Sequence, residues 1–359
     1  MIKQYTSLGL MSGTSGDGVD ASIIESDGES KYKVILDKYF KYDINIYKNI
    51  HKLKDSLNNK NDLIHRSKEI KELERKITLF HAKVVKELGY KNIDIIGFHG
   101  QTIFHDSDKK ISLQLGDAKI LSQLTKKKVV YNFRENDIKN GGQGAPLTPI
   151  FHKLLVSQKK ISLPTTILNL GGIANITSID INNKMFSCDI GPGNCLIDKW
   201  IRENSDKNFD DEGKIAQSGT INKIILDQSL DNFYNSQVSK KKSFDTKDFD
   251  LSFVRGLTLE DGLATLTEFT AQIFFEKKFH KNIYACGGGR KNKFLLKSIE
   301  KVINCKIKLI DELNVDGDFI ESQAFAYIAI RSNLGLNISF PETTGIKQPC
   351  SGGEIIDIR

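Results

Sequence analysis

The sequence predicts an α/β protein built from two similar domains. Short apolar runs that fit buried strands alternate with segments whose apolar residues recur at helical spacing. A hairpin with a glycine-rich turn occurs near the N-terminus and is repeated about 160 residues later, as in a duplicated domain. The length of 359 residues is enough for two domains, each with its own core. We expect domains over residues 1–145 and 146–359, with a C-terminal segment able to pack back on the first domain.

The first hairpin encloses the sequence GLMSGTSGDGVD at Gly9–Asp20. Apolar runs on both sides predict two strands, and the turn between them is rich in glycine and hydroxyl side chains. Glycines let backbone N–H groups converge on one concavity, and such a nest of donors binds phosphate. The carboxylates of Asp17 and Asp20 would then require a divalent cation beside the phosphate. A glycine-rich β-turn with solvated aspartates is the alternative interpretation.

The rest of the first half continues the alternation of strands and helices. Residues 31–42 extend the opening sheet, and the polar stretch 43–68 receives no assignment. Apolar residues from Ile70 to Leu88 recur at helical spacing, and Gly89 ends that helix. Further strands are expected over 93–98, 111–115 and 129–132, and a helix over 118–124. His99 directly follows a buried strand, where ligand sites of α/β proteins lie, so a ligand role and a structural role are both open.

Residues 133–149 read as a loop because Gly141, Gly142 and Gly144 occur within four positions. The loop suggests a hinge or the wall of a cleft, and a helix over 149–156 follows it. Arg134 and Asp137 either form a surface ion pair or present a guanidinium and a carboxylate to a polar ligand.

The second half repeats the glycine hairpin. Strands are expected over 165–170, 173–181 and 184–189, followed by Gly191-Pro-Gly-Asn and a helix over 196–203. Asp189 ends a strand just before a helix N-terminus, a position that favours anions. A carboxylate there indicates a general base or a cation ligand. Capping of the following helix is the alternative.

The polar stretch 209–253 predicts a mobile surface excursion. Helices are expected over 259–279, 293–303 and 322–334, and strands over 283–286 and 306–309. Gly287–Gly289 stands between a strand and a helix, where a flat ligand such as a base or ribose could lie against the backbone. Alanines at 324, 326 and 329 give the last helix a small-residue face. Glu321 at its N-terminus is explained either by the helix dipole or by a ligand.

Composition excludes several classes of function. The formal charge of +7 comes from scattered lysines without interleaved aromatics, which predicts solvated faces and no nucleic-acid partner. Five cysteines without CxxC or Cys/His spacing predict reduced thiols in a cytoplasm. The sequence has neither a signal peptide nor an apolar run of about 18 residues, so we expect no membrane segment.

Eight motifs occur in an order that resembles the anhydro-N-acetylmuramic acid kinase family, from Leu8 to about Pro341. They are GLMSGTSGDGVD, GFHGQTIFH, QLGD, NFREND with GGQGAPLTPIFH, NLGGIANIT, DIGPGNCLIDKW, CGGGRKN and ESQAFAYIAIR. The order of GGQGAPL and GPGN is far more specific than any single glycine loop. The chain departs from the family at Gly16, where leucine is common, and at Ile190, where threonine is common.

The resemblance implies two ribonuclease-H-like (actin-like ATPase) domains that face each other across a cleft. It implies a cytoplasmic homodimer that uses ATP, Mg²⁺ and water to convert 1,6-anhydro-N-acetylmuramic acid to N-acetylmuramic acid 6-phosphate and ADP in peptidoglycan recycling. A kinase of another anhydrosugar, such as levoglucosan, is one alternative. A non-catalytic sensor of nucleotide or sugar with the same fold is the other.

The resemblance also implies roles for individual residues. Asp189 would be the base that activates water, and Asp17 would contact Mg²⁺ through water. Arg134 and Glu321 would line the sugar site, with His99 and Asn175 as weaker candidates there. The residues expected to bind ATP are Gly13, Thr14, Ser15, Gly16, Asp17, Gly18, Val19, Asp20, Gly172, Asn175, Gly191, Gly193, Gly287, Gly288 and Gly289.

Overall fold

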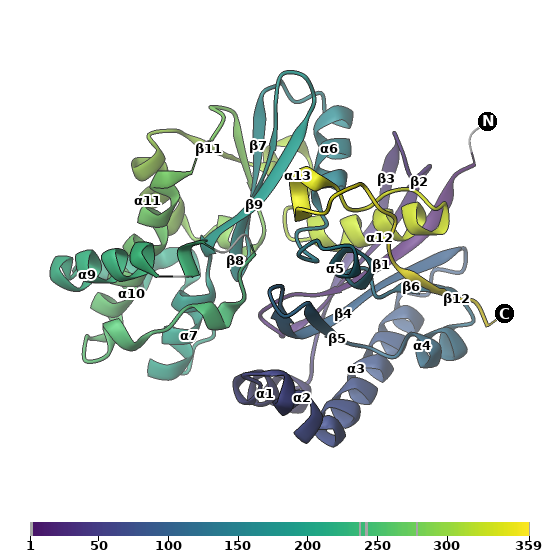
Figure 1. The fold of residues 1–359 in the computed structure, drawn as a ribbon, viewed down its shortest axis with the longest axis horizontal. Helices are drawn as coiled ribbons and strands as arrows, with labels where there is room; N and C mark the ends of the chain where they lie inside the picture. The colour runs from purple at the N-terminus through teal and green to yellow at the C-terminus, as the bar shows by residue number, and fades with distance from the viewer. Residues whose placement is uncertain (1–2, 237, 241–242, 278, 359) are drawn as a thin grey trace. The chain divides into compact units, whose positions relative to one another are not determined.

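The computed structural model describes residues 3–236, 238–240, 243–277 and 279–358 (Figure 1). The chain forms two compact units: unit 1 comprises Met1–Lys160 and Phe319–Arg359, and unit 2 comprises Ile161–Asp318. The boundary expected at 145/146 lies before helix α6 (Pro149–Gln158), which belongs to unit 1. Phe151 of this helix packs edge-on against Tyr32, with 5.0 Å between the ring centroids. The aromatic contact anchors α6 to unit 1.

Unit 1 is built on a seven-stranded mixed sheet with the order β12-β6-β4-β1-β2-β3, and β5 pairs with β4. The strands are β1 (Tyr5–Ser12), β2 (Gly18–Ser26), β3 (Tyr32–Lys41), β4 (Ile95–Asp106), β5 (Ile111–Leu115), β6 (Lys128–Tyr131) and β12 (Glu354–Ile356). β1, β2 and β3 form an antiparallel meander, whereas β4 runs parallel to β1 and β6 runs parallel to β4.

The helices of unit 1 include two in the stretch that sequence patterns left unassigned. Besides α6, they are α1 (Ile44–Ser56), α2 (Lys60–His65), α3 (Ser67–Leu88), α4 (Ala118–Thr125), α5 (Glu135–Lys139), α12 (Ile320–Asn333) and α13 (Pro341–Thr344). Asp43 caps α1 by accepting hydrogen bonds from the backbone N–H groups of Asn45 and Ile46. Gly89 ends α3 with a left-handed φ of 64°, as predicted. The short helix α5 lies inside the segment that was expected to be a loop.

Helix α12 packs directly on the sheet of unit 1, because glycines in two strands leave room for its backbone. A Cβ atom at Gly9 would lie 1.9 Å from the carbonyl oxygen of Ser322, and one at Gly97 would lie 2.4 Å from that of Phe325. Ala326 faces Gly9 from the helix. The predicted close packing is therefore confirmed for Ala326 and Ala329, which meet Gly9 and Gly97 on the sheet.

Unit 2 is built on a five-stranded sheet with the order β11-β10-β7-β8-β9. The strands are β7 (Thr165–Leu170), β8 (Ile173–Ile179), β9 (Met185–Pro192), β10 (Ile283–Cys286) and β11 (Ile307–Leu309). β7, β8 and β9 form an antiparallel meander, whereas β10 runs parallel to β7 and β11 runs parallel to β10. This is the same arrangement as β3-β2-β1-β4-β6 of unit 1. A three-stranded meander extended by two parallel strands is the ribonuclease-H-like topology, and its repetition confirms the predicted fold class.

The helices of unit 2 are α7 (Cys195–Asn204), α8 (Lys214–Ser218), α9 (Lys223–Asn235), α10 (Leu259–Gln272) and α11 (Lys293–Ile303). The prediction that residues 209–253 form a surface excursion is wrong for the described part of this stretch. Phe244, Phe249 and Leu251 are buried in the hydrophobic core of unit 2. The polar composition of the stretch hid these apolar residues, because lysines and aspartates surround them. Helix α10 also ends earlier than expected and continues as a 3-10 turn over Ile273–Glu276.

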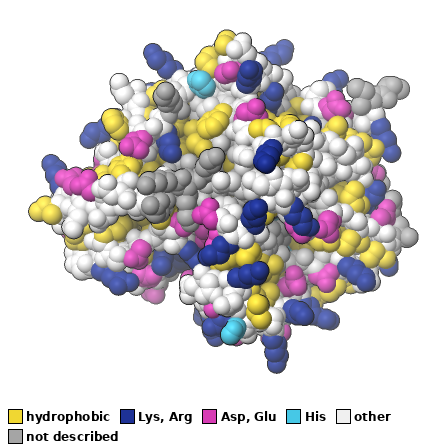
Figure 2. Space-filling model, in the orientation of Figure 1, with side chains coloured by type: hydrophobic (Ala, Val, Ile, Leu, Met, Phe, Trp, Pro, Cys, Tyr) yellow, Lys and Arg dark blue, Asp and Glu magenta, His cyan; other side chains and the backbone are white. Residues whose placement is uncertain are grey.

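Charged side chains of both signs are interspersed on the face shown in Figure 2, where Lys and Arg lie among Asp and Glu. No helix of the described residues is long and apolar enough to cross a membrane.

Candidate active site

The turn between β1 and β2 exposes the side chains that the phosphate prediction requires. Thr14, Ser15 and Asp17 are exposed, whereas the loop backbone is closed by a hydrogen bond from the Gly16 N–H to the Gly13 carbonyl of 3.1 Å. Gly16 has a φ of 61°, a conformation that a leucine would adopt only with strain. Glycine at position 16, where leucine is common in the family that the motifs resemble, therefore suits this turn.

Three side chains from other elements hold the carbonyl groups of this turn. Lys54 of α1 donates to the Thr14 carbonyl at 3.0 Å, and a ring nitrogen of His51 lies 2.9 Å from the Ser15 carbonyl. Gln101 of β4 donates to the Gly13 carbonyl at 3.0 Å. Sequence reasoning missed all three residues, because His51 and Lys54 lie in the unassigned stretch and Gln101, although part of the GFHGQTIFH motif, received no role. Lys54 brings a cation to a loop whose own charged side chains are carboxylates.

Asp17 is held in place from two sides. The Tyr39 hydroxyl donates to Asp17 Oδ2 at 3.0 Å, and the Ser15 hydroxyl donates to the other carboxylate oxygen. Burial and the neighbouring Asp17 carboxylate raise the pKa of Tyr39, so its hydroxyl stays a donor. Within the described residues, no group of three His, Cys, Asp or Glu side chains gathers to hold a metal ion. A Mg²⁺ bound through Asp17 would therefore take its other ligands from phosphate oxygens and water, as this ion commonly does.

The second glycine hairpin forms a tight junction in unit 2. The N–H of Gly193 donates to the Gly172 carbonyl at 2.9 Å, and that of Asn194 donates to the Gly171 carbonyl at 2.9 Å. A Cβ at Gly193 would lie 2.2 Å from the Gly171 oxygen, so only glycine allows this approach. A Cβ at Gly191 would press on Ile273.

Asp189 is buried, with 6% of its surface exposed, and its Oδ2 accepts a hydrogen bond of 2.9 Å from the Phe244 N–H. The expectation that Asp189 ends its strand is wrong, because β9 continues to Pro192. The alternative that it caps the next helix is also wrong, because Asn194 occupies the N-cap of α7.

Asn175 is the strand partner of Asp189 in the β8–β9 register. Its Oδ1 atom is buried and has no hydrogen-bond partner among the described residues. An unpaired buried amide oxygen is costly, so we expect an ordered water or a bound ligand to donate to it. Ile190, the second departure from the family pattern, packs in the hydrophobic core of unit 2.

The third glycine run lies against the same junction. A Cβ at Gly289 would lie 2.7 Å from the Asn194 side chain, and one at Gly287 would lie 2.5 Å from Asn169 Oδ1. A Cβ at Gly288 would meet nothing within 4 Å, so this backbone is open. The structure therefore brings together the second and third glycine motifs of the chain, which both lie in unit 2.

In unit 1 His99 contacts both Arg134 and the aromatic ring of Phe325. Arg134 donates through Nη1 to the Gly144 carbonyl at 2.7 Å and through Nη2 to His99 Nε2 at 2.9 Å. The His99 ring lies 4.4 Å from the ring of Phe325. Glu321 precedes Phe325 by four residues in α12, which puts both on the same face of that helix.

His99 lies within β4, which continues to Asp106, so the expected strand end at residue 98 is wrong. Its Nδ1–H donates to the Gly100 carbonyl at 2.8 Å, which leaves Nε2 to accept from Arg134. Burial, followed by the charge of Arg134, lowers the pKa of His99 to about 3. The imidazole is therefore neutral at physiological pH and orients the guanidinium.

Asp137 does not face a ligand and does not form a surface ion pair. It is fully buried, and its Oδ2 accepts from the Gly144 N–H at 2.6 Å while Oδ1 accepts from the Thr344 hydroxyl at 2.5 Å. Burial raises the pKa of this carboxyl. Asp137 thus closes the glycine-rich loop and ties it to the C-terminal segment.

Acidification is expected to destabilise unit 1 through His99. The unfolded histidine takes up a proton near pH 6.5, whereas the folded one resists until about pH 3. Between these values the unfolded state binds one more proton, so the free energy of unfolding falls by about 1.4 kcal/mol per pH unit as the pH drops. Denaturant unfolding of the His99→Gln variant between pH 6 and 4 should show a shallower slope. His65→Gln, which alters an exposed histidine, should keep the wild-type slope; equal slopes in both variants would contradict the prediction.

Two ribonuclease-H-like units with glycine turns at equivalent hairpins define a protein of the actin-like ATPase and sugar-kinase class. The chain belongs to the anhydro-N-acetylmuramic acid kinase family, whose model matches residues 5–357. It is 57% identical to the anhydro-N-acetylmuramic acid kinase of Pelagibacter ubique, over 99% of each chain. It is 39% identical to the protein of that name from Zymomonas mobilis subsp. mobilis, over 97% of this chain and 98% of that one. The chain is therefore a kinase.

Solved structures resemble the chain at low identity. Component A of (R)-2-hydroxyglutaryl-CoA dehydratase from Acidaminococcus fermentans matches with a TM-score of 0.43 and 10% identity, over 92% of this chain and 99% of that one. A ROK family glucokinase from Streptomyces griseus, in complex with glucose and AMPPNP, matches with a TM-score of 0.41 and 10% identity, over 90% and 99% of the two chains.

Proposed function

We propose that this kinase converts 1,6-anhydro-N-acetylmuramic acid, ATP and water to N-acetylmuramic acid 6-phosphate and ADP, in the recycling of peptidoglycan. The sugar's O6 is bonded to C1 in the anhydro bridge, so it has no hydroxyl proton to lose. Water attacks C1, the C1–O6 bond breaks, and O6 takes the γ-phosphoryl group. The proton of the attacking water passes to a base, and ADP leaves.

Asp189 is the proposed base. The observation that carries the proposal is its pairing in register with Asn175, whose buried Oδ1 lacks a partner among the described residues. Asn175 can accept a hydrogen bond from the attacking water or from a hydroxyl group of the bound sugar or nucleotide. The hydrogen bond from Phe244 N–H to one carboxylate oxygen fixes Asp189 and orients the other oxygen.

Each unit supplies part of the proposed binding machinery. In unit 1, the N–H and hydroxyl groups of Gly13–Asp20 bind the phosphates of ATP, and Asp17 holds Mg²⁺ through water. In unit 2, Gly172, Asn175, Gly191, Gly193 and Gly287–Gly289 bind the nucleotide. Bound Mg²⁺ supplies positive charge that offsets the charge of the phosphates. Positioning and charge neutralisation are the main requirements of phosphoryl transfer.

Arg134, Glu321 and His99 are the proposed sugar-binding residues. Arg134 is oriented by neutral His99, so its guanidinium can pair with the lactyl carboxylate of a muramic acid. Levoglucosan has the same anhydro bridge without that carboxylate. A fixed guanidinium therefore favours the muramic substrate over levoglucosan.

The test is a coupled ADP-release assay with ATP and Mg²⁺, run separately on 1,6-anhydro-N-acetylmuramic acid, levoglucosan and free N-acetylmuramic acid. Turnover on the first sugar alone is expected. Turnover on levoglucosan alone would keep the reaction type and overturn the substrate. ATP binding without turnover on any of the three would support the non-catalytic sensor instead. By the family resemblance we also propose that the protein is cytoplasmic and forms a homodimer. Size-exclusion chromatography with light scattering tests the homodimer.

A further inference from the structure

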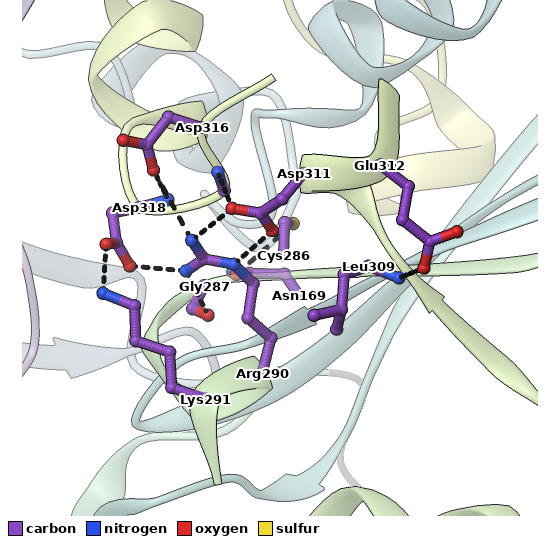
Figure 3. A network of polar contacts seen from close by, with 11 residues as sticks. Asn169, Cys286, Gly287, Arg290, Lys291, Leu309, Asp311, Glu312, Asp316 and Asp318 are labelled. Atoms are coloured by element: carbon purple, nitrogen blue, oxygen red, sulfur yellow. Dashed lines mark hydrogen bonds and ion pairs between the residues drawn. The ribbon is translucent and has the colours of Figure 1, made fainter. Parts of the chain in front are cut away.

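Arg290 directly follows the glycine run of unit 2 and is buried, with 4% of its surface exposed. Figure 3 shows its guanidinium surrounded by three aspartates from one later segment of the chain. Nε and Nη2 donate to the two carboxylate oxygens of Asp311 at 2.7 and 2.8 Å. Nη1 donates to Asp318 at 2.5 Å, and Nη2 also lies 3.5 Å from Asp316. The paired contact with Asp311 is the strongest kind of side-chain ion pair.

The same guanidinium joins two backbone segments. Nη1 donates to the Gly287 carbonyl at 3.2 Å, and the Gly287 N–H donates to the Gly317 carbonyl at 2.9 Å. A Cβ at Gly317 would lie 2.5 Å from Arg290 Nε, so this glycine is what lets the segment 311–318 approach. Gly287 has a φ of 79°, which glycine adopts without strain, so these contacts select one conformation of a backbone that has several open to it.

The charges of this network are unbalanced without Arg290. Its guanidinium holds the pKa of Asp311 below the usual range, chiefly through their hydrogen bond. Hydrogen bonds from Arg290 and Lys291 lower the pKa of Asp318, against the effect of its burial. Removing the guanidinium would leave neighbouring carboxylates without their cation, which is costly at a partly buried site.

Arg290 cannot itself contact a ligand, because its three nitrogens are all engaged and its side chain is buried. The backbone that it fixes is nevertheless accessible, since a Cβ at Gly288 would meet nothing within 4 Å. We propose that Arg290 is a positioning residue for nucleotide, and that its pairing with Asp311 holds Gly287–Gly289 in the shape that receives the nucleoside. This inference rests on the proposed function, in which that glycine run approaches the nucleoside of ATP.

The test compares Asp311→Asn with Glu312→Gln in the full-length enzyme. Asp311→Asn removes the paired carboxylate from Arg290. Glu312→Gln makes the same chemical change one residue later, and Glu312 bonds to the Leu309 N–H at 3.0 Å rather than to Arg290 (Figure 3). For Asp311→Asn, the KM for ATP and the dissociation constant of ATP from calorimetry should rise about tenfold, because small misplacements of a binding loop weaken binding. The KM for the sugar should stay within about twofold of wild type, and Glu312→Gln should resemble wild type in each constant.

Arg290→Lys is the second variant. It keeps the positive charge but cannot pair with both oxygens of Asp311, so it should weaken ATP binding as Asp311→Asn does. The inference is overturned if both variants bind ATP as tightly as wild type. It is also overturned if the KM values for ATP and sugar rise equally along with a lower unfolding temperature, because that pattern indicates general destabilisation. If the wild-type enzyme itself binds no ATP, the proposed function fails and this inference fails with it.

Discussion

Replacing Asp189 with asparagine is expected to lower kcat by a factor on the order of 10² or more and to leave the affinity for ATP nearly unchanged. An asparagine oxygen can still accept the Phe244 N–H, which Asp189 Oδ2 now accepts at 2.9 Å. The amide group cannot take a proton from water, so the proposed attack on C1 loses its base. Coupled ADP release gives kcat and KM, and calorimetric titration gives the affinity for ATP.

Asp210→Asn is the matched control for this variant. Asp210 is also buried in unit 2, with 4% exposure, and accepts backbone N–H groups of Ile215 and Ala216 at 2.9 and 2.8 Å. It belongs to no proposed binding or catalytic group, so its variant should lose stability while keeping its turnover number. Wild-type turnover by Asp189→Asn would refute the assignment of the base. Joint loss of turnover and ATP affinity would instead make Asp189 a nucleotide or cation ligand.

Local signals predicted the strands and the glycine turns because these features depend on a few neighbouring residues. The hairpin at Gly13–Asp20 is an example, since alternating apolar runs and a glycine turn need no information from the rest of the chain. Helix α1 was missed because its stretch was read as polar, although Ile46, Ile50 and Leu53 stand at helical spacing and Asp43 gave a usable capping signal. The overlooked helix carries His51 and Lys54, which contact the carbonyl groups of the turn between β1 and β2.

Burial of charged residues could not be predicted in the same way. Asp137 and Arg290 both stand in polar stretches that contain glycines, and charged residues there are usually exposed. Their partners, Thr344 for Asp137 and Asp311 for Arg290, lie 207 and 21 residues away in the sequence. Only tertiary packing brings these groups together, so a single sequence offers no signal for their structural role.

The close packing at Gly9 also depends on tertiary contacts that a single sequence does not reveal. Its loss leads to the largest expected decrease in stability. Gly9→Ala is expected to lower the free energy of unfolding by on the order of 2–3 kcal/mol, as overpacking in a core does. The added methyl carbon would lie 1.9 Å from the Ser322 carbonyl oxygen and 2.7 Å from the Ala326 nitrogen. Both are backbone atoms of α12, so the helix itself must move away from the sheet. Chemical denaturation monitored by far-UV circular dichroism measures the change.

Gly13→Ala is the matched control, because it adds the same methyl group to the same hairpin. The nearest atom to that methyl carbon would be Ser15 Oγ at 3.9 Å, and Gly13 has no positive φ. This variant should unfold at the wild-type denaturant concentration. If Gly9→Ala did so too, the close packing of α12 on β1 would be refuted. Because Glu321 precedes Ser322 in α12, displacement of the helix should also raise the KM for the sugar in Gly9→Ala, which links packing at the sheet to the proposed sugar site.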